Sequence, residues 1–171
     1  MQTDTHTFKP ATSDRRMLYA LAHPDDESFG PGGSIIRYAN AGYDVHLICG
    51  TRGECGTVDE HFLNGYKDIA ELRTAELLCA AQHLNLTALH LLNYRDSGMP
   101  GSPDNHHPRA LAAASTEEVA LRVAGLIRQI RPQVIVTFDP IGGYYHPHHI
   151  AIYLATGQAF TLATHPTFDD G

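Results

Sequence analysis

The stretch that decides the fold is residues 17–27, which reads MLYALAHPDDE. Its first six residues are apolar and show no helical period, and a histidine, a proline and three acids follow at once. This pattern predicts a short buried β-strand that ends in a polar loop.

Further strands and helices follow from the same kind of spacing. Apolar or β-branched runs predict strands over residues 43–50, 89–93 and 134–138. Helical spacing and end signals, among them a capping box made by Ser115 and Glu118, predict helices over residues 34–41, 68–84, 115–132 and 148–163. The alternation predicts an α/β fold with an open, mostly parallel sheet and helices on both faces. Ligands in such folds bind beyond the carboxyl ends of the strands, where the strand order reverses.

The composition is that of one packed, acidic domain. The 171 residues include 12 Lys and Arg against 19 Asp and Glu, a formal net charge of -7, and no basic run. These features exclude nucleic acid and anionic membranes as partners. No apolar stretch is long enough to span a membrane, and residues 1–14 lack the apolar core of a signal peptide, so we expect a cytoplasmic protein.

We expect residues 1–14 to form a disordered or extended arm and residues 15–171 to form a single domain. The chain reaches Gly171 without a clear closing element, so the sequence leaves open whether the domain lacks its C-terminal part. Three cysteines without a C-x-x-C pair predict reduced, structural thiols.

The first candidate site follows the first strand. His23 and Asp26 are three residues apart and could converge on one divalent cation, with Asp25 left free. The alternative is that an acid caps the next helix and His23 is an ordinary polar residue.

The second candidate site follows the last predicted strand, where residues 139–149 read DPIGGYYHPHH. If the strand order reverses between the first and fourth predicted strands, the two loops face each other, and His149 is the natural third ligand. Two histidines and one carboxylate leave a coordination position open, as catalytic sites require. The alternative is a solvated histidine patch.

Four segments together resemble a known family: residues 23–27, 71–73, 95–99 and 142–149. They are similar to the LmbE-like (PIG-L type) N-acetylglucosaminyl deacetylases, and most of all to the mycothiol deacetylase and mycothiol conjugate amidase branch, over about residues 17–160. The resemblance implies a Rossmann-like fold and a zinc-dependent hydrolase that removes an acyl group from a small N-acetylated amino-sugar conjugate. Fe²⁺ or another divalent metal is the alternative cofactor, and a homo-oligomer is compatible with the resemblance.

The resemblance also implies a role for each site residue. His23, Asp26 and His149 would bind the metal, and Asp25 would be the general base. His146 and Tyr144 would stabilise the oxyanion. Arg73 and Asp96 would bind substrate, although their spacing alone equally fits an ordinary surface ion pair.

Three departures from the family pattern bear on these roles. His148 stands where the family usually has an aspartate that orients the neighbouring imidazole, so we expect an altered pKa at His146. Thr57 replaces an acid common in the mycothiol branch, which weakens the prediction of the exact substrate. The family also continues beyond the position of Gly171.

Other function classes have less support. A carbohydrate-binding relative without catalysis remains an alternative. The same ligand set occurs in iron oxygenases with two histidines and one carboxylate, but those triads normally lie on β-rich scaffolds. The glycines at 30–33 do not match a dinucleotide-binding loop, because Ile35 occupies the last glycine position.

Overall fold

The computed structural model describes residues 2–166, and within them five strands form one sheet in the order β1-β4-β3-β2-β5. The strands β2, β3, β4 and β5 are parallel, and β1 pairs with β4 in the antiparallel sense. Their bounds are Asp4–Thr7 (β1), Arg16–Leu21 (β2), Asp44–Thr51 (β3), Ala88–Tyr94 (β4) and Val134–Val136 (β5). The predicted α/β fold with a mostly parallel sheet is confirmed. The expected domain end at Gly171 lies outside the described residues.

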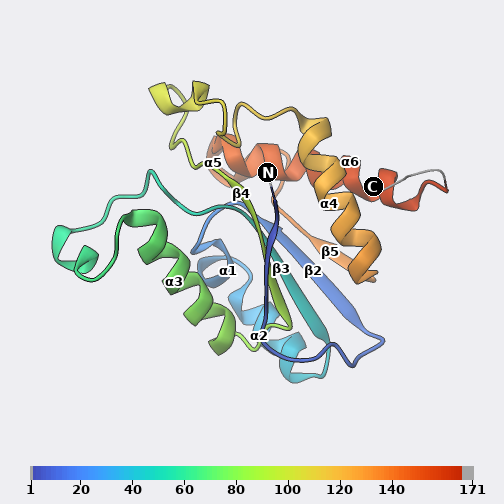
Figure 1. The fold of residues 1–171 in the computed structure, drawn as a ribbon. Coiled ribbons are helices and arrows are strands. Elements are labelled where there is room, and N and C mark those ends of the chain that lie inside the picture. The colour runs from blue at the N-terminus through green and yellow to red at the C-terminus, as the bar shows by residue number, and fades with distance from the viewer. Residues whose placement is uncertain (1, 167–171) are drawn as a thin grey trace.

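Helices cover both faces of this sheet, as Figure 1 shows. On one face lie α2 (Gly32–Asn40) and α3 (Ile69–His83), and on the other lie α4 (Thr116–Ile130) and α6 (Pro147–Thr164). The shorter elements are α1 (Asp26–Phe29), η1 (Glu60–Leu63), η2 (Pro103–His106) and α5 (Gly142–Tyr145).

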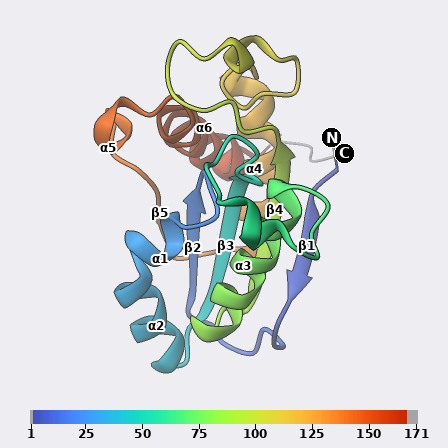
Figure 2. The ribbon, with the colours of Figure 1, turned by 90° about the vertical axis from the view of Figure 1, so that its left-hand side faces the viewer.

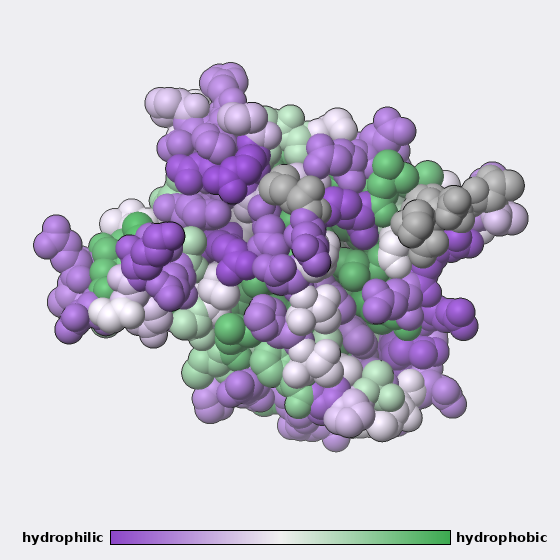
Figure 3. Space-filling view, in the orientation of Figure 1, coloured by the Kyte–Doolittle hydropathy of each residue, from purple (hydrophilic) through white to green (hydrophobic). Residues whose placement is uncertain are grey.

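Alternate residues of the interior strand β2 enter two separate hydrophobic cores. Leu18 and Ala20 pack in the core beneath α4 and α6, and Met17 and Tyr19 pack in the core beneath α2 and α3. Both faces of β2 are therefore buried, which explains why its sequence is continuously apolar rather than alternating. The outer face seen in Figure 3 is mostly hydrophilic, with small separate hydrophobic areas.

The strand order places the two candidate loops together. From β2 the chain moves outward through β3 to β4, and then returns to place β5 on the opposite side of β2. The reversal point therefore lies between β2 and β5, which correspond to the first and fourth predicted strands, so the condition under which the two loops face each other is met. The connection from β4 to α4 forms a loop at the same end of the sheet (Figure 2).

Two strands differ from the sequence prediction. The polar N-terminal segment contains β1, which is tied to the sheet by Asp4: its Oδ2 accepts hydrogen bonds from Arg52 (2.8 Å) and Asn93 (3.0 Å). The last strand, β5, ends at Val136, two residues earlier than predicted, because Phe138 leaves the sheet and stacks on His149. None of the helices within residues 2–166 has the length and apolar character needed to cross a membrane.

Candidate active site

His23, Asp26 and His149 converge at the carboxyl end of β2. His23 Nδ1 lies 3.2 Å from His149 Nε2 and 3.5 Å from Asp26 Oδ2, and His149 Nε2 lies 3.4 Å from Asp26 Oδ1. All three side chains are largely shielded from solvent. Two loops that are more than a hundred residues apart in the sequence thus form one His/Asp group that could hold a metal ion.

These donor atoms lie close enough together to bind one ion. Ligands placed about 2.1 Å from a zinc ion at the corners of a tetrahedron are about 3.4 Å apart. The two imidazole nitrogens are 3.2 Å apart, close to that value, and Asp26 faces them with different oxygens, Oδ2 toward His23 at 3.5 Å and Oδ1 toward His149 at 3.4 Å. Two imidazoles and a carboxylate are also a suitable donor set for zinc or ferrous iron.

The orientation of His149 is set by its surroundings. Its Nδ1 lies 3.2 Å from the carbonyl oxygen of Gly142, a group that can only accept, so Nδ1 carries the proton and Nε2 presents a lone pair to the group. The ring of Phe138 stacks on the imidazole, with ring centroids 3.9 Å apart and an interplanar angle of 6°. Such outer contacts are typical of metal-binding histidines.

Asp26 is held as a carboxylate. Its Oδ2 accepts hydrogen bonds from the backbone N–H groups of His23 (2.8 Å) and Ala22 (3.2 Å). Burial acts to raise the pKa of Asp26, but the contacts with His149 and His23 outweigh burial and hold that pKa well below its ordinary value. The carboxylate is therefore ionised, as metal binding requires.

Asp25 lies beside the group in a strained backbone conformation. Its φ is 126°, a region that residues with a side chain rarely adopt. Its N–H donates to Glu27 Oε2 (3.0 Å), and its Oδ2 accepts from Arg73 at 2.7 Å. The Asp25 carboxylate is partly exposed, whereas Glu27 is buried, so the turn presents one acid outward and uses the other to fix its own shape.

The structure places Arg73 and Asp96 in protein contacts. Arg73 bonds to Asp25 and to the carbonyl of Pro24, and its guanidinium packs closely against the turn formed by Gly53 and Gly56. Asp96 is buried and accepts hydrogen bonds from the backbone N–H groups of Cys55 (3.0 Å) and Gly98 (2.9 Å). Burial acts to raise the pKa of Asp96, but these bonds and His23 lower it below its ordinary value. Arg73 thus forms an ion pair with the partly exposed Asp25, whereas Asp96 is buried and faces His148.

His146 and Tyr144 pack against the histidines of the group. His146 caps the N-terminus of α6, where its Nδ1 accepts the N–H of His148 (3.2 Å), so the neutral ring carries its proton on Nε2. Burial, followed by the neighbouring His23 and His149, lowers the pKa of His146 to about 4. Tyr144 is 60% exposed, and its ring meets those of His146 and His149 edge to face.

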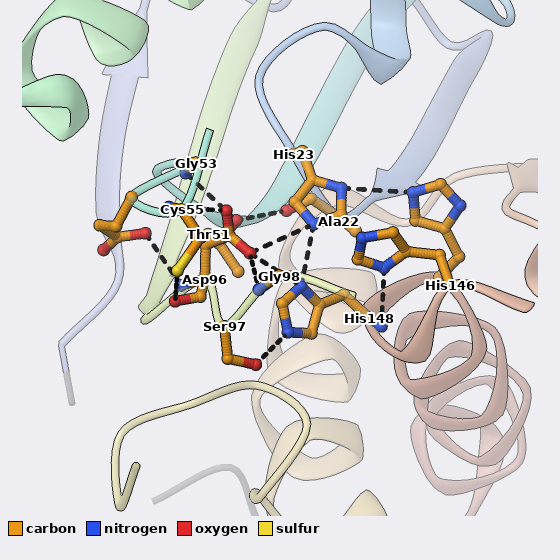
Figure 4. Close-up of polar contacts among 12 residues, drawn as sticks. Ala22, His23, Thr51, Gly53, Cys55, Asp96, Ser97, Gly98, His146 and His148 are labelled. Carbon is orange, nitrogen blue, oxygen red and sulfur yellow. Dashed lines mark hydrogen bonds and ion pairs between the residues drawn. The ribbon is translucent and has the colours of Figure 1, made fainter. Parts of the chain in front are cut away.

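His148 is completely buried, and its two ring nitrogens contact His23 and Ser97 rather than His146. Its Nδ1 lies 2.9 Å from His23 Nε2, and its Nε2 lies 2.8 Å from Ser97 Oγ (Figure 4). The low pKa of His146 therefore arises from burial and from His23 and His149, whereas the departure at position 148 acts on His23. His23, His146 and His148 form a second group of donor atoms close enough to hold an ion.

Three residues that support the site were missed in the sequence. Glu27 belongs to the acidic block, but nothing in its spacing indicates that its carboxylate would turn back onto the backbone of Asp25. Ser97 lies in the long loop after β4, and Phe138 reads as the end of a strand. Their contacts with His148 and His149 depend on how the loops pack, which local sequence does not encode.

Comparison with known proteins gives a consistent result. A model of the PIG-L family, described as GlcNAc-PI de-N-acetylase, matches residues 18–160. A 1D-myo-inositol 2-acetamido-2-deoxy-alpha-D-glucopyranoside deacetylase from Kineococcus radiotolerans is 46% identical over 164 residues, which cover 87% of this chain and 45% of the relative. A deacetylase 2 of the same description from Catenulispora acidiphila is 45% identical, with 87% of this chain and 52% of the relative covered. The chain thus spans about half the length of these curated relatives.

Solved structures share the fold. The N,N'-diacetylchitobiose deacetylase of Pyrococcus horikoshii is 27% identical with a TM-score of 0.70, over 91% of this chain and 53% of that one. A 4-carboxy-2-hydroxymuconate hydratase from Pseudomonas putida is 22% identical with a TM-score of 0.67, over 90% of this chain and 59% of that one, and shows the fold alone. The family model extends over both candidate loops and all four parallel strands, and the chain therefore belongs to the PIG-L family.

Proposed function

We propose that this chain forms the catalytic site of a zinc-dependent hydrolase that removes the acetyl group from an N-acetylglucosamine-type substrate. The observation that carries the proposal is the convergence of His23, Asp26 and His149, with Asp25 next to Asp26 in the same turn. Support for the reaction comes from the family and from relatives named as deacetylases of an acetamido sugar.

The chain's own groups account for each proton that the reaction must move. A divalent cation held by His23, Asp26 and His149 would polarise the amide carbonyl and lower the pKa of a bound water to about 7. Asp25 would accept the proton of the attacking water and return it to the leaving amine. The hydrogen bond from Arg73 to Asp25 Oδ2 fixes the plane of that carboxylate.

His146 and Tyr144 are the proposed donors for the developing oxyanion. The neutral ring of His146 carries its proton on Nε2, and Tyr144 supplies a hydroxyl next to it. Hydrogen-bond donors fixed in advance at such a position typically contribute about 3 kcal/mol each to lowering the barrier. We assign this role to His146 and Tyr144.

A hollow of about 500 Å³ adjoins Asp25 and suits the remainder of a sugar conjugate. Its lining combines the exposed rings of Phe29 and Phe62 with Arg73, Asp59 and Glu76. Apolar ring faces beside charged groups match the mixed surface of a glycoside. We propose a small acetylated amino-sugar conjugate as substrate and the cytoplasm as the location; a homo-oligomer stays a prediction.

Two alternatives fare less well. An iron oxygenase would use the same ligand set of two histidines and one carboxylate, but the mostly parallel α/β sheet and the family match favour a hydrolase. A binding protein without catalysis would keep the metal site and show no turnover, so the experiment below separates it from a deacetylase.

The test compares Asp25→Asn with His149→Ala, measuring bound zinc by mass spectrometry and acetate release from an N-acetylglucosaminyl conjugate. Asp25→Asn should keep zinc and lose activity by about 10²- to 10⁴-fold, the usual contribution of a general base. His149→Ala should lose zinc and activity together. The exposed Asp14→Asn serves as the control and should change neither.

The outcomes separate the assignments. Full activity in Asp25→Asn would refute the base, and stoichiometric zinc in His149→Ala would refute the ligand. Wild-type protein that binds zinc but releases no acetate from any N-acetyl sugar would overturn the deacetylase proposal and favour a binding protein.

A further inference from the structure

We propose that His148 is a positioning residue: it accepts the Nε2 proton of His23 and thereby keeps the Nδ1 lone pair of His23 directed at the metal. The inference rests on the proposed metal site. It is carried by the chain of contacts from His23 Nε2 to His148 Nδ1 (2.9 Å) and from His148 Nε2 to Ser97 Oγ (2.8 Å). Every member of this chain is buried.

Metal binding by His23 would determine where each proton lies. His23 faces Asp26 and His149 with Nδ1, so metal binding requires a bare Nδ1 and places the ring proton on Nε2. That proton points at His148 Nδ1, which must then be an acceptor. His148 consequently carries its own proton on Nε2 and donates it to Ser97 Oγ.

Asn105 anchors Ser97, the last residue in this series of hydrogen bonds. Its Nδ2 donates to both the carbonyl oxygen of Ser97 (2.8 Å) and Ser97 Oγ (3.0 Å), which fixes the hydroxyl in place. Metal-binding histidines almost always donate their second N–H to a carboxylate, a carbonyl or water. Here a neutral imidazole fills that role.

Asp96 stabilises the proton between the two imidazoles. Its Oδ1 lies 3.3 Å from His148 Nδ1 and 3.9 Å from His23 Nε2. Backbone N–H groups of Gly98 and Cys55 hold this carboxylate in position. The negative charge favours a proton in this contact, and the bare Nδ1 that metal binding requires on His23 assigns that proton to His23 Nε2.

The same contacts indicate that the group of His23, His146 and His148 holds a proton rather than a second ion. The 2.9 Å between His23 Nε2 and His148 Nδ1 is a hydrogen-bond length and shorter than the roughly 3.4 Å between tetrahedral zinc ligands. His146 Nδ1 is already occupied by the N–H of His148. One ion per chain is therefore expected.

Two substitutions separate hydrogen bonding from packing. His148→Leu keeps a buried side chain but removes the acceptor, and His148→Asn keeps an acceptor oxygen near the position of Nδ1. Loss of an outer hydrogen-bond partner typically lowers metal affinity by about 10- to 100-fold. We expect that loss in His148→Leu and recovery of most of it in His148→Asn.

His90→Leu is the matched control. His90 is also buried and bonded on both ring nitrogens, to Thr5 Oγ1 (3.0 Å) and His46 Nδ1 (3.2 Å), but it lies outside the site. This variant should lose stability and keep the wild-type zinc affinity.

The experiment is zinc affinity by competition with a chelator, together with ¹⁵N NMR of the histidine rings in zinc-loaded protein. The expected spectrum shows His148 protonated on Nε2 and bare on Nδ1. A proton on His148 Nδ1, unchanged affinity in His148→Leu, or two bound zinc ions per chain would each overturn the inference. Absence of zinc binding in the wild type would instead refute the metal site itself.

Discussion

Gly142 connects the backbone to the geometry of the site. Its φ is +62°, its carbonyl accepts from His149 Nδ1, and a Cβ added there would lie 2.9 Å from His149 Cβ and 3.0 Å from the backbone N of Ile150. Only glycine satisfies both the left-handed conformation and this close approach. Gly142 thus helps to set the position of the His149 ring relative to His23 and Asp26.

Gly142→Ala should therefore destabilise the chain by about 1–3 kcal/mol and weaken zinc binding, because the displaced turn moves His149. Urea unfolding of the metal-free protein and chelator competition measure the two effects. Gly143→Ala is the control, since Gly143 has φ +71° but no atom within 4 Å of an added Cβ. It should lose stability and keep its zinc affinity; equal zinc affinities in both variants would contradict this account of Gly142.

At the residue scale, the meeting of His23, Asp26 and His149 could be predicted because each follows a strand on one side of the reversal point. Their role as ligands stays a prediction. The contacts of Arg73, Asp96 and His148 could not be predicted, since they depend on the packing of long loops whose spacing carries no periodic signal.

Among the elements, α4 has the clearest local signal. Ser115 Oγ accepts the N–H of Glu118 at 3.1 Å, as the capping box predicts. The carboxylate of Glu118 instead accepts from the hydroxyl of Tyr94 (2.8 Å), which joins the helix to β4. Ser115 therefore caps the helix as predicted, whereas Glu118 makes a tertiary contact instead of completing the capping box.

Ser115→Ala should reduce the free energy of unfolding by about 1 kcal/mol, the usual cost of losing an N-cap. Ser115→Asp retains the cap and should stay near wild type. Urea denaturation measures both variants, and equal stability of Ser115→Ala and Ser115→Asp would show that the cap contributes nothing here.

The elements also show why some boundaries escaped prediction. Buried strands and amphipathic helices can be predicted from the pattern of their apolar residues. The boundaries of β2, β3, β4 and α4 accordingly lie close to the predicted ranges. The edge strand β1 is polar and is held by hydrogen bonds from Arg52 and Asn93, so it has no hydrophobic pattern to detect. β5 is shortened by the tertiary contact of Phe138 with His149.

For the whole molecule, the buried histidines predict how stability depends on pH. Burial, together with the neighbouring His46, lowers the pKa of His90 from 6.5 to about 4. The unfolded chain therefore binds more protons than the folded chain between those values, so stability rises with pH across this window and is lost as pH falls through it.

Metal-free wild type should accordingly be less stable at pH 5 than at pH 7, as measured by urea denaturation in the presence of chelator. His90→Leu should show a smaller difference between the two pH values, because one buried histidine no longer titrates. The same difference in both proteins would show that His90 does not contribute.

The overall topology followed from the alternation of strands and helices, but the reaction did not follow from the topology. A hydratase and deacetylases share this fold, so the chemistry has to be argued from the residues at the reversal point between β2 and β5. That point brings one imidazole and one carboxylate from the first loop to one imidazole from the second.

A zinc-soaked crystal of this chain, measured with anomalous scattering at the zinc edge, tests this arrangement most directly. The predicted result is a single peak about 2.0–2.2 Å from His23 Nδ1, an oxygen of Asp26 and His149 Nε2, with at least one position left to solvent. A peak centred instead on His23 Nε2, His146 and His148, or no peak between the two loops, would contradict it.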